Sequence, residues 1–101
     1  MTIFWSNQAK KQLREVFKFY KEATSIELAE KVKNRLIQKP TILLEHPELG
    51  QEETNEAVAG MGFRYLFESH HKIVYKLYPS ESIILIAAVF DTRQNPDKLR
   101  V

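Results

Sequence analysis

The last third of the chain sets the strongest constraint on its fold. Three apolar, strand-like runs follow one another there, at residues 63–68, 72–78 and 83–90. In the first two, successive side chains fall into two alternating sets, whereas the third is apolar throughout, which is typical of a central strand covered on both faces. Because only short polar breaks at 69–71 and 79–81 join the runs, we expect an antiparallel meander.

The N-terminal region is predicted to form a strand followed by a helix. Thr2–Trp5 is a short apolar and aromatic run, as strands favour. Ser6 then suits the N-cap of a helix that should end near Glu22 or Ala23. The predicted helix has one apolar face, because its apolar residues recur at offsets of three and four: Ala9, Leu13, Val16, Phe17 and Tyr20.

A second helix is predicted to begin at Thr24. Thr24 and Glu27 have the spacing of a capping box. The apolar stripe continues past Pro40, so we expect helix to about Glu45 with a kink or break near Lys39. The short join between the two helices makes them an antiparallel hairpin.

The order of these elements predicts a single α+β domain over residues 1–101. Residues 50–62 are rich in acids and glycine and read as a loop with a short turn around Glu56–Ala59. The helical hairpin should pack on one face of a twisted antiparallel sheet. The other face should stay partly open, as a place where a ligand could sit.

Composition narrows the classes of function. The chain has no cysteine, which excludes disulfides and thiolate zinc sites and fits a reducing cytosol. Fifteen Lys and Arg against thirteen Asp and Glu give a net charge of +2, too mild to indicate nucleic-acid binding alone. We expect no signal peptide at the N-terminus and no membrane segment, since no apolar run approaches the ~20 residues that span a bilayer.

Histidines are the first candidates for proton transfer. His70 and His71 could both titrate near neutral pH, but neighbouring residues of a strand point to opposite sides. In a tight turn, histidine is usually a polar turn residue. His46, beside Pro47, suits a helix C-terminus better than a metal site. No convergent ligand set is visible, so we expect neither metal nor cofactor.

Three basic residues on or just past the predicted strands are candidates for an anion site: Arg64, Lys72 and Arg93. Arg64 suits either a structural pair with an acid or a fork around a phosphate. Lys72 opens its strand and is expected near Arg93, which follows the last strand. The chain has no phosphate-binding glycine loop and no serine nucleophile motif, which argues against a conventional metabolic enzyme.

Taken together, the segments resemble the RelE/ParE superfamily of bacterial type II toxins, often labelled plasmid stabilization proteins. The resemblance rests on the first strand ending in Trp-Ser, on Leu44 and Pro47–Gly50, and on the segments FRYL, KIVYKLY and VFDTRQNP. It covers almost the whole chain. It implies a compact α+β fold, a cytoplasmic protein that inhibits growth, and a cognate antitoxin whose C-terminal segment wraps and blocks it.

The resemblance also implies two activities. RelE-like members cleave messenger RNA on the ribosome with basic side chains of the sheet, whereas ParE-like members poison DNA gyrase. Lys72 matches a basic position of the nucleases, and Arg93 approximates another after the last strand. Where the nucleases carry a pair of lysines, this chain has Phe63 and Tyr65, with Arg64 between them, and its tail lacks a tyrosine. These departures favour the ParE side.

Three functions therefore stay open. The first is a toxin that binds a cellular target such as DNA gyrase. The second is a ribosome-dependent, metal-free mRNA endoribonuclease, in which a 2′-hydroxyl attacks the adjacent phosphate. Arg64, Lys72 and Arg93 would then surround the developing charge, and His70 or His71 would move the proton. The third is a catalytically inactive member that only binds an antitoxin-like partner.

Overall fold

The computed structural model describes residues 1–93 and shows one sheet with a helical hairpin. Asn95, Pro96 and the tail that lacks a tyrosine lie outside the described residues. In chain order the elements are β1 (Thr2–Trp5), α1 (Asn7–Ala23), α2 (Ile26–Gln38), the 3₁₀ helix η1 (Lys39–Leu44), β2 (Gln51–Glu52), β3 (Phe63–Glu68), β4 (His71–Tyr78), the 3₁₀ turn η2 (Pro79–Glu81) and β5 (Ile83–Asp91).

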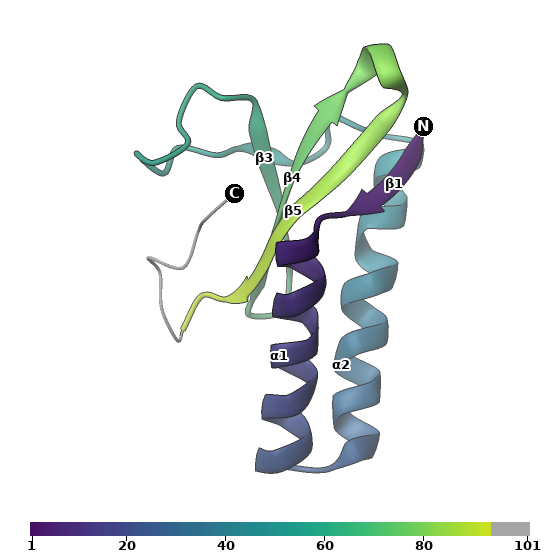
Figure 1. Ribbon diagram of the computed structural model, residues 1–101, viewed down its shortest axis with the longest axis vertical. Helices are drawn as coiled ribbons and strands as arrows, with labels where there is room; N and C mark the ends of the chain where they lie inside the picture. Colours follow the sequence, from purple (N-terminus) through teal and green to yellow (C-terminus); the bar gives the residue numbers. More distant parts are fainter. Residues whose placement is uncertain (94–101) are drawn as a thin grey trace.

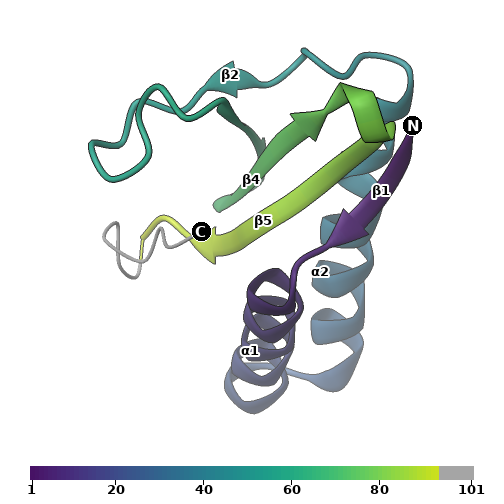
Figure 2. The same ribbon diagram turned by 45° about the horizontal axis from the view of Figure 1, so that its top comes forward.

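The sheet has the strand order β1-β5-β4-β3-β2; Figure 1 labels the first four of these strands, and Figure 2 labels β2. β1 runs parallel to β5, and the remaining pairs are antiparallel. This confirms the predicted strand, hairpin and meander, and it places β5 centrally, between β1 and β4. β2 was not predicted, because two residues are too few to show an alternation; its pairing with Arg64 and Tyr65 makes it visible only in the fold.

The predicted helix boundaries are correct for α1 and wrong by one residue for α2. Ser6 caps α1, and its Oγ accepts from the Ala9 amide at 3.0 Å. Ser25, rather than Thr24, caps α2 by accepting from the Leu28 amide. Thr24 instead ends α1, with its amide and hydroxyl both donated to the Tyr20 carbonyl. The serine wins because its extended backbone points its hydroxyl at the free amides of the first turn.

The expected break near Lys39 is confirmed. α2 ends at Gln38, and the chain continues as the 3₁₀ helix η1, which has Pro40 in its first turn. Proline lacks an amide hydrogen and cannot continue an α-helical ladder. Pro40 and Leu43 are nonetheless buried, so the stripe still reaches the core after the helix type has changed.

The helices cover one face of the sheet (Figure 2), and the second face is covered only in part. Helix residues such as Ala9 and Leu36 pack on one face, with Ile73, Tyr75 and Ile86 below them. On the second face the loop between β2 and β3 supplies a single buried apolar side chain, Val58. Val58 lies in a second cluster with five strand residues: Phe63, Val74, Ala87, Ala88 and Phe90. The second face is therefore partly closed by the chain itself.

A β-bulge in β5 reverses the phase of that strand. Val74 pairs with Ala88 and Tyr75 with Ile86, which leaves Ala87 as an extra residue. Before the bulge, Ile86 faces the helices; after it, odd-numbered residues do, beginning with Val89. A bulge inserts one residue and so moves every later side chain to the opposite face. The end of β5 is thereby turned towards α1.

The turn that leads from η1 into the sheet is held by a buried tyrosine. The Tyr75 side chain is fully buried, and its hydroxyl donates to the Pro47 carbonyl at 2.8 Å and accepts from the Gly50 amide at 2.9 Å. A Cβ on Gly50 would lie only 2.6 Å from the Tyr75 ring and hydroxyl. Glycine is therefore required at residue 50 by the closeness of the ring.

Tyr75→Phe should lower the free energy of unfolding by about 1–3 kcal/mol, because it leaves a buried amide and a buried carbonyl without their partner. The matched control is Tyr65→Phe, which removes an exposed hydroxyl bonded to Gln51 and should change stability by less than about 0.5 kcal/mol. Urea unfolding followed by tryptophan fluorescence measures both. Equal effects of the two substitutions would contradict the role given to Tyr75.

Candidate functional site

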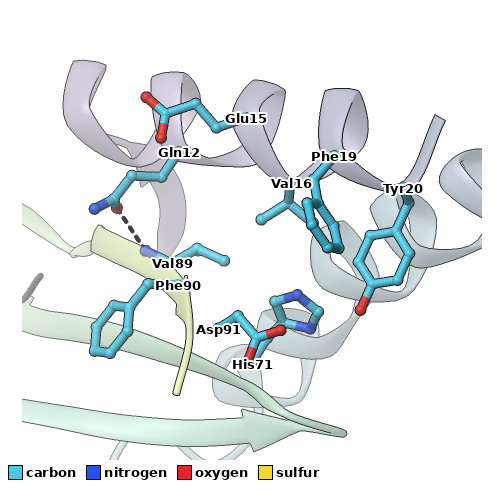
Figure 3. A pocket seen from close by; sticks show the side chains of 9 residues that line it. All are labelled: Gln12, Glu15, Val16, Phe19, Tyr20, His71, Val89, Phe90 and Asp91. Atoms are coloured by element: carbon cyan, nitrogen blue, oxygen red, sulfur yellow. Dashed lines mark hydrogen bonds between the residues drawn. The ribbon is translucent and has the colours of Figure 1, made fainter. Parts of the chain in front are cut away.

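The end of β5, the start of β4 and one side of α1 enclose a small polar hollow (Figure 3). Gln12, Tyr20, His71 and Asp91 line it together with apolar residues. Gln12 also accepts the Val89 amide at 2.8 Å, which satisfies an edge of β5 that β1 is too short to reach. The hollow measures about 50 Å³, room for one or two water molecules and too little for a nucleotide.

His71 lies at this hollow and is the first residue of β4, not part of the turn as predicted. It is 3% exposed, and its Nε2 has no hydrogen-bond partner within residues 1–93. Burial lowers the pKa of His71; Asp91 opposes this shift, while Arg93 and His70 add to it. Burial therefore favours the neutral form of the imidazole. The His70 side chain is exposed, whereas that of His71 is buried. The two histidines therefore do not act as a pair, which agrees with the expectation from the sequence.

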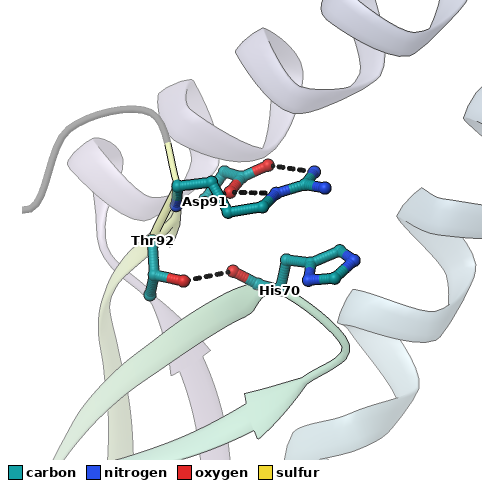
Figure 4. A network of polar contacts seen from close by, with 4 residues as sticks. His70, Asp91 and Thr92 are labelled. Atoms are coloured by element: carbon teal, nitrogen blue, oxygen red, sulfur yellow. Dashed lines mark hydrogen bonds and ion pairs between the residues drawn. The ribbon is translucent and has the colours of Figure 1, made fainter.

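Asp91 and Arg93 form a close ion pair beside the hollow. The Arg93 Nη2 donates to Asp91 Oδ2 at 2.8 Å and Nε donates to Oδ1 at 3.1 Å, and the Arg93 amide also donates to Oδ1. These hydrogen bonds lower the pKa of Asp91. Thr92, between them, donates its amide and hydroxyl to the His70 carbonyl (Figure 4). The residue after β5 is thus tied to the residue before β4.

Lys72 lies on the second face of the sheet, opposite to Arg93. It pairs in register with Phe90, which faces the Val58 cluster, whereas Asp91 and Arg93 lie on the α1 side. The expectation that Lys72 and Arg93 are close is therefore wrong. The Lys72 Nζ lies 2.7 Å from Glu53 Oε2 and 4.1 Å from the centre of the Tyr65 ring. Lys72 is 18% exposed and Glu53 only 3%.

Arg64 has a structural role. Its Nη1 donates to the Gly50 carbonyl at 2.9 Å and to the Glu48 carbonyl at 3.3 Å. It shares the helix-side face with Tyr75, its partner in register. The structural interpretation of Arg64 is therefore supported, although its partners are backbone carbonyls rather than the acids that the sequence suggested.

The three basic candidates do not converge on one site. Arg64 fixes the turn before β2, Lys72 is paired on the second face, and Arg93 is paired at the end of β5. Lys72 and Arg93 pair with two acids, Glu53 and Asp91, that were not among the residues predicted from the sequence. Asp91 stands two residues before Arg93, a spacing that could have indicated the pair; Glu53 stands among several acids, with nothing to mark it.

The described residues contain neither a cluster of metal ligands nor a helix that could span a membrane. Within residues 1–93 no three metal-ligating side chains come together. No helix in this part of the chain is long and apolar enough to cross a membrane.

The free energy of unfolding should fall as the pH drops below about 6.5, the pKa of histidine in an unfolded chain. Because burial lowers the pKa of His71 in the folded protein, the unfolded chain binds the extra proton first, and stability is lost as the pH falls towards the folded pKa. His71→Gln should flatten this slope, which for one proton is at most about 1.4 kcal/mol per pH unit.

Urea unfolding between pH 7.5 and 5 measures this slope, and His70→Gln is the control, since it removes the exposed neighbour. The contribution of Asp91 falls in a separate window. Its pKa is lowered from 3.8, so its stabilisation is lost only at more acidic pH. A slope that survives in His71→Gln and disappears in His70→Gln would contradict the assignment.

Comparison with known proteins shows which family the chain matches. A family model described as the ParE toxin of the type II toxin–antitoxin system parDE matches residues 3–96. A search of curated proteins finds no match. Among solved structures, a chromosomal ParDE toxin–antitoxin system from P. aeruginosa is similar with a TM-score of 0.75 and 17% identity, over 90% of this chain and 95% of that one.

A second solved structure, the toxin–antitoxin complex RelBE2 from Mycobacterium tuberculosis, is similar with a TM-score of 0.67 and 13% identity, over 89% of this chain and 95% of that one. At these identities the two structures show the shared fold. The match to the family model, which spans nearly the whole chain, goes further: the chain belongs to the ParE toxin family of type II toxin–antitoxin systems.

Proposed function

We propose that this chain is a toxin that acts by binding a cellular protein, DNA gyrase, rather than by cutting RNA, and that a cognate antitoxin neutralises it. The ParE family membership supports the toxin class. The two similar structures, a ParDE toxin–antitoxin system and a RelBE2 toxin–antitoxin complex, support an antitoxin partner. On this proposal the protein acts in the cytoplasm, where gyrase and DNA are.

The observation that carries the choice of mechanism is the internal pairing of the basic side chains. Cleavage of a phosphodiester by neighbouring-group attack needs cations aimed at the phosphate that gains charge. Here Lys72 is neutralised by Glu53, and Arg64 is engaged by two carbonyls. Arg93 is bonded to Asp91 and lies on the other face from Lys72.

Proton transfer has no better support. His71 would have to give and accept a proton at a phosphate, yet it is 3% exposed at a hollow of about 50 Å³. A general base must come within hydrogen-bond reach of the proton that it takes. Binding to a protein target needs no such convergence, because exposed apolar and basic residues of a folded surface suffice.

Induced expression in a bacterial host should stop DNA synthesis before protein synthesis, and ribosome-bound transcripts should stay intact. Incorporation of labelled thymidine and methionine measures the order, and primer extension on abundant transcripts detects cuts. In parallel, the purified protein should inhibit supercoiling of relaxed plasmid by purified gyrase. Rapid loss of translation with cut transcripts would overturn the proposal, and normal growth with active gyrase would favour an inactive partner-binding protein.

If transcripts are cut, Arg93→Ala decides whether the family's basic position is used. A ribonuclease that relies on Arg93 should lose on the order of 10²–10³-fold in cleavage rate. Arg14→Ala is the matched control, since it removes an exposed arginine of α1 and should leave cleavage within about twofold. Melting curves of both variants separate loss of activity from loss of folding.

A further inference from the structure

A buried ion pair fastens the loop between β2 and β3 to the second face of the sheet. Within residues 53–62 only Glu53 and Val58 are buried. Val58 packs in the cluster with Phe63, Val74 and Phe90. Glu53 lies at the start of the loop, with its carboxylate next to Lys72. Two side chains, one apolar and one charged, thus fasten the loop.

The Glu53 carboxylate is committed on both oxygens. Oε1 accepts from the Asn55 amide at 3.0 Å, which folds the first residues of the loop back on themselves. Oε2 lies 2.7 Å from Lys72 Nζ, but outside the directions of a regular hydrogen bond, and it has no other partner within the described chain. A carboxylate that is 97% removed from solvent depends on this one ammonium for its charge compensation.

Lys72 is held from two sides. Its ammonium lies between the Glu53 carboxylate and the face of the Tyr65 ring, 4.1 Å from the ring centre. Lys76, two residues further along β4, contacts the Phe63 and Tyr78 rings at 5.2 and 5.4 Å, and the described residues contain no ion pair for it. The strand thus carries two lysines on the same face, and only Lys72 is neutralised by a buried acid.

Two glycines near the end of the loop have a backbone conformation that other residues rarely adopt. Gly60 and Gly62 both have positive φ, +78° and +87°, and an added Cβ at Gly60 would meet nothing within 4 Å. The internal hydrogen bonds of the loop run from Val58 to Asn55 and from Met61 to Val58, so they tie the loop to itself. Among the described residues, the Glu53 amide makes the only backbone hydrogen bond between this loop and a strand, to the Phe63 carbonyl.

We propose that residues 53–62 form a cover over the second face of the sheet and that the Glu53–Lys72 ion pair is its latch. Closed, the cover neutralises Lys72 and hides the apolar floor of Phe63, Val74 and Phe90. Open, it leaves a free ammonium at the edge of that floor. A ligand that displaces the cover must replace the Glu53 carboxylate beside Lys72 and the aliphatic Val58 side chain on the apolar floor.

Limited proteolysis with thermolysin tests the cover, because the enzyme cuts before large apolar residues and the loop offers two of these, Val58 and Met61. Val58 is 5% exposed and must leave its cluster to be cut, whereas Met61 is 51% exposed and serves as an internal reference. Initial rates of cleavage before Val58 and before Met61 are read from the fragments by mass spectrometry, on the full chain in its native state.

Glu53→Gln should raise the rate of cleavage before Val58 roughly tenfold relative to Met61, because the amide cannot neutralise Lys72 and a charge-assisted contact is lost. Glu52→Gln is the matched control. It makes the same chemical change at the preceding residue, which is exposed in β2, and it should leave the ratio within about twofold of the wild type. Equal ratios in all three proteins would overturn the proposal.

Lys72→Met removes the latch from the other side and should raise the same ratio as Glu53→Gln does. Agreement of the two variants supports a latch, and a rise in only one of them would contradict it. Emission from Trp5, on the distant strand β1, reports whether either variant has unfolded as a whole. RNA cleavage that appears in Glu53→Gln would overturn the gyrase proposal and leave the cover standing, so the two proposals fail separately.

Discussion

The buried hydroxyl of Tyr75 is the contact on which the arrangement of this small domain depends. It is bonded to the Pro47 carbonyl and the Gly50 amide, two backbone groups of the turn that leaves the helical layer. The Arg64 guanidinium holds the carbonyls of the same turn from the neighbouring strand. Since β2 begins one residue later, these bonds set where Gln51 and Glu52 pair, and therefore where the following loop starts across the second face.

The buried charges of the domain are likewise paired within the chain. A buried ion pair contributes little to stability in itself, because the loss of hydration nearly cancels the attraction, but removal of one partner strands the other. Glu53 and Asp91 are both nearly inaccessible, and each is compensated by one basic side chain. Lys72 and Arg93 are thereby committed to the fold, on opposite faces of the sheet. Both residues look free in the sequence, but in the fold each is paired with a buried carboxylate.

The sequence predicts the elements whose apolar residues recur at a regular spacing. It does not predict contacts that depend on single residues, such as a cap or an ion pair. The two helices, the meander and the central place of residues 83–90 follow from repeats of 3.6 and 2 that any packed face must show. Ser25 was missed because Thr24, unlike Ser25, has a glutamate three residues later, and only the backbone angles decide between two adjacent caps. The pairing of Glu53 was beyond reach, since it joins residues 19 positions apart through a loop that has no repeat.

The bulge at Ala87 shows why the positions of functional residues are harder to transfer than a fold. With a strict alternation along β5, Asp91 would lie on the face that carries Lys72, and a basic pair could form there. The one extra residue turns Asp91 and Arg93 towards α1 and leaves Lys72 to Glu53. Two chains can therefore share the strand order and the basic positions of this fold while presenting those charges on different surfaces. A difference of one residue in one strand is enough to separate a set of cations that would have to act together on a phosphate.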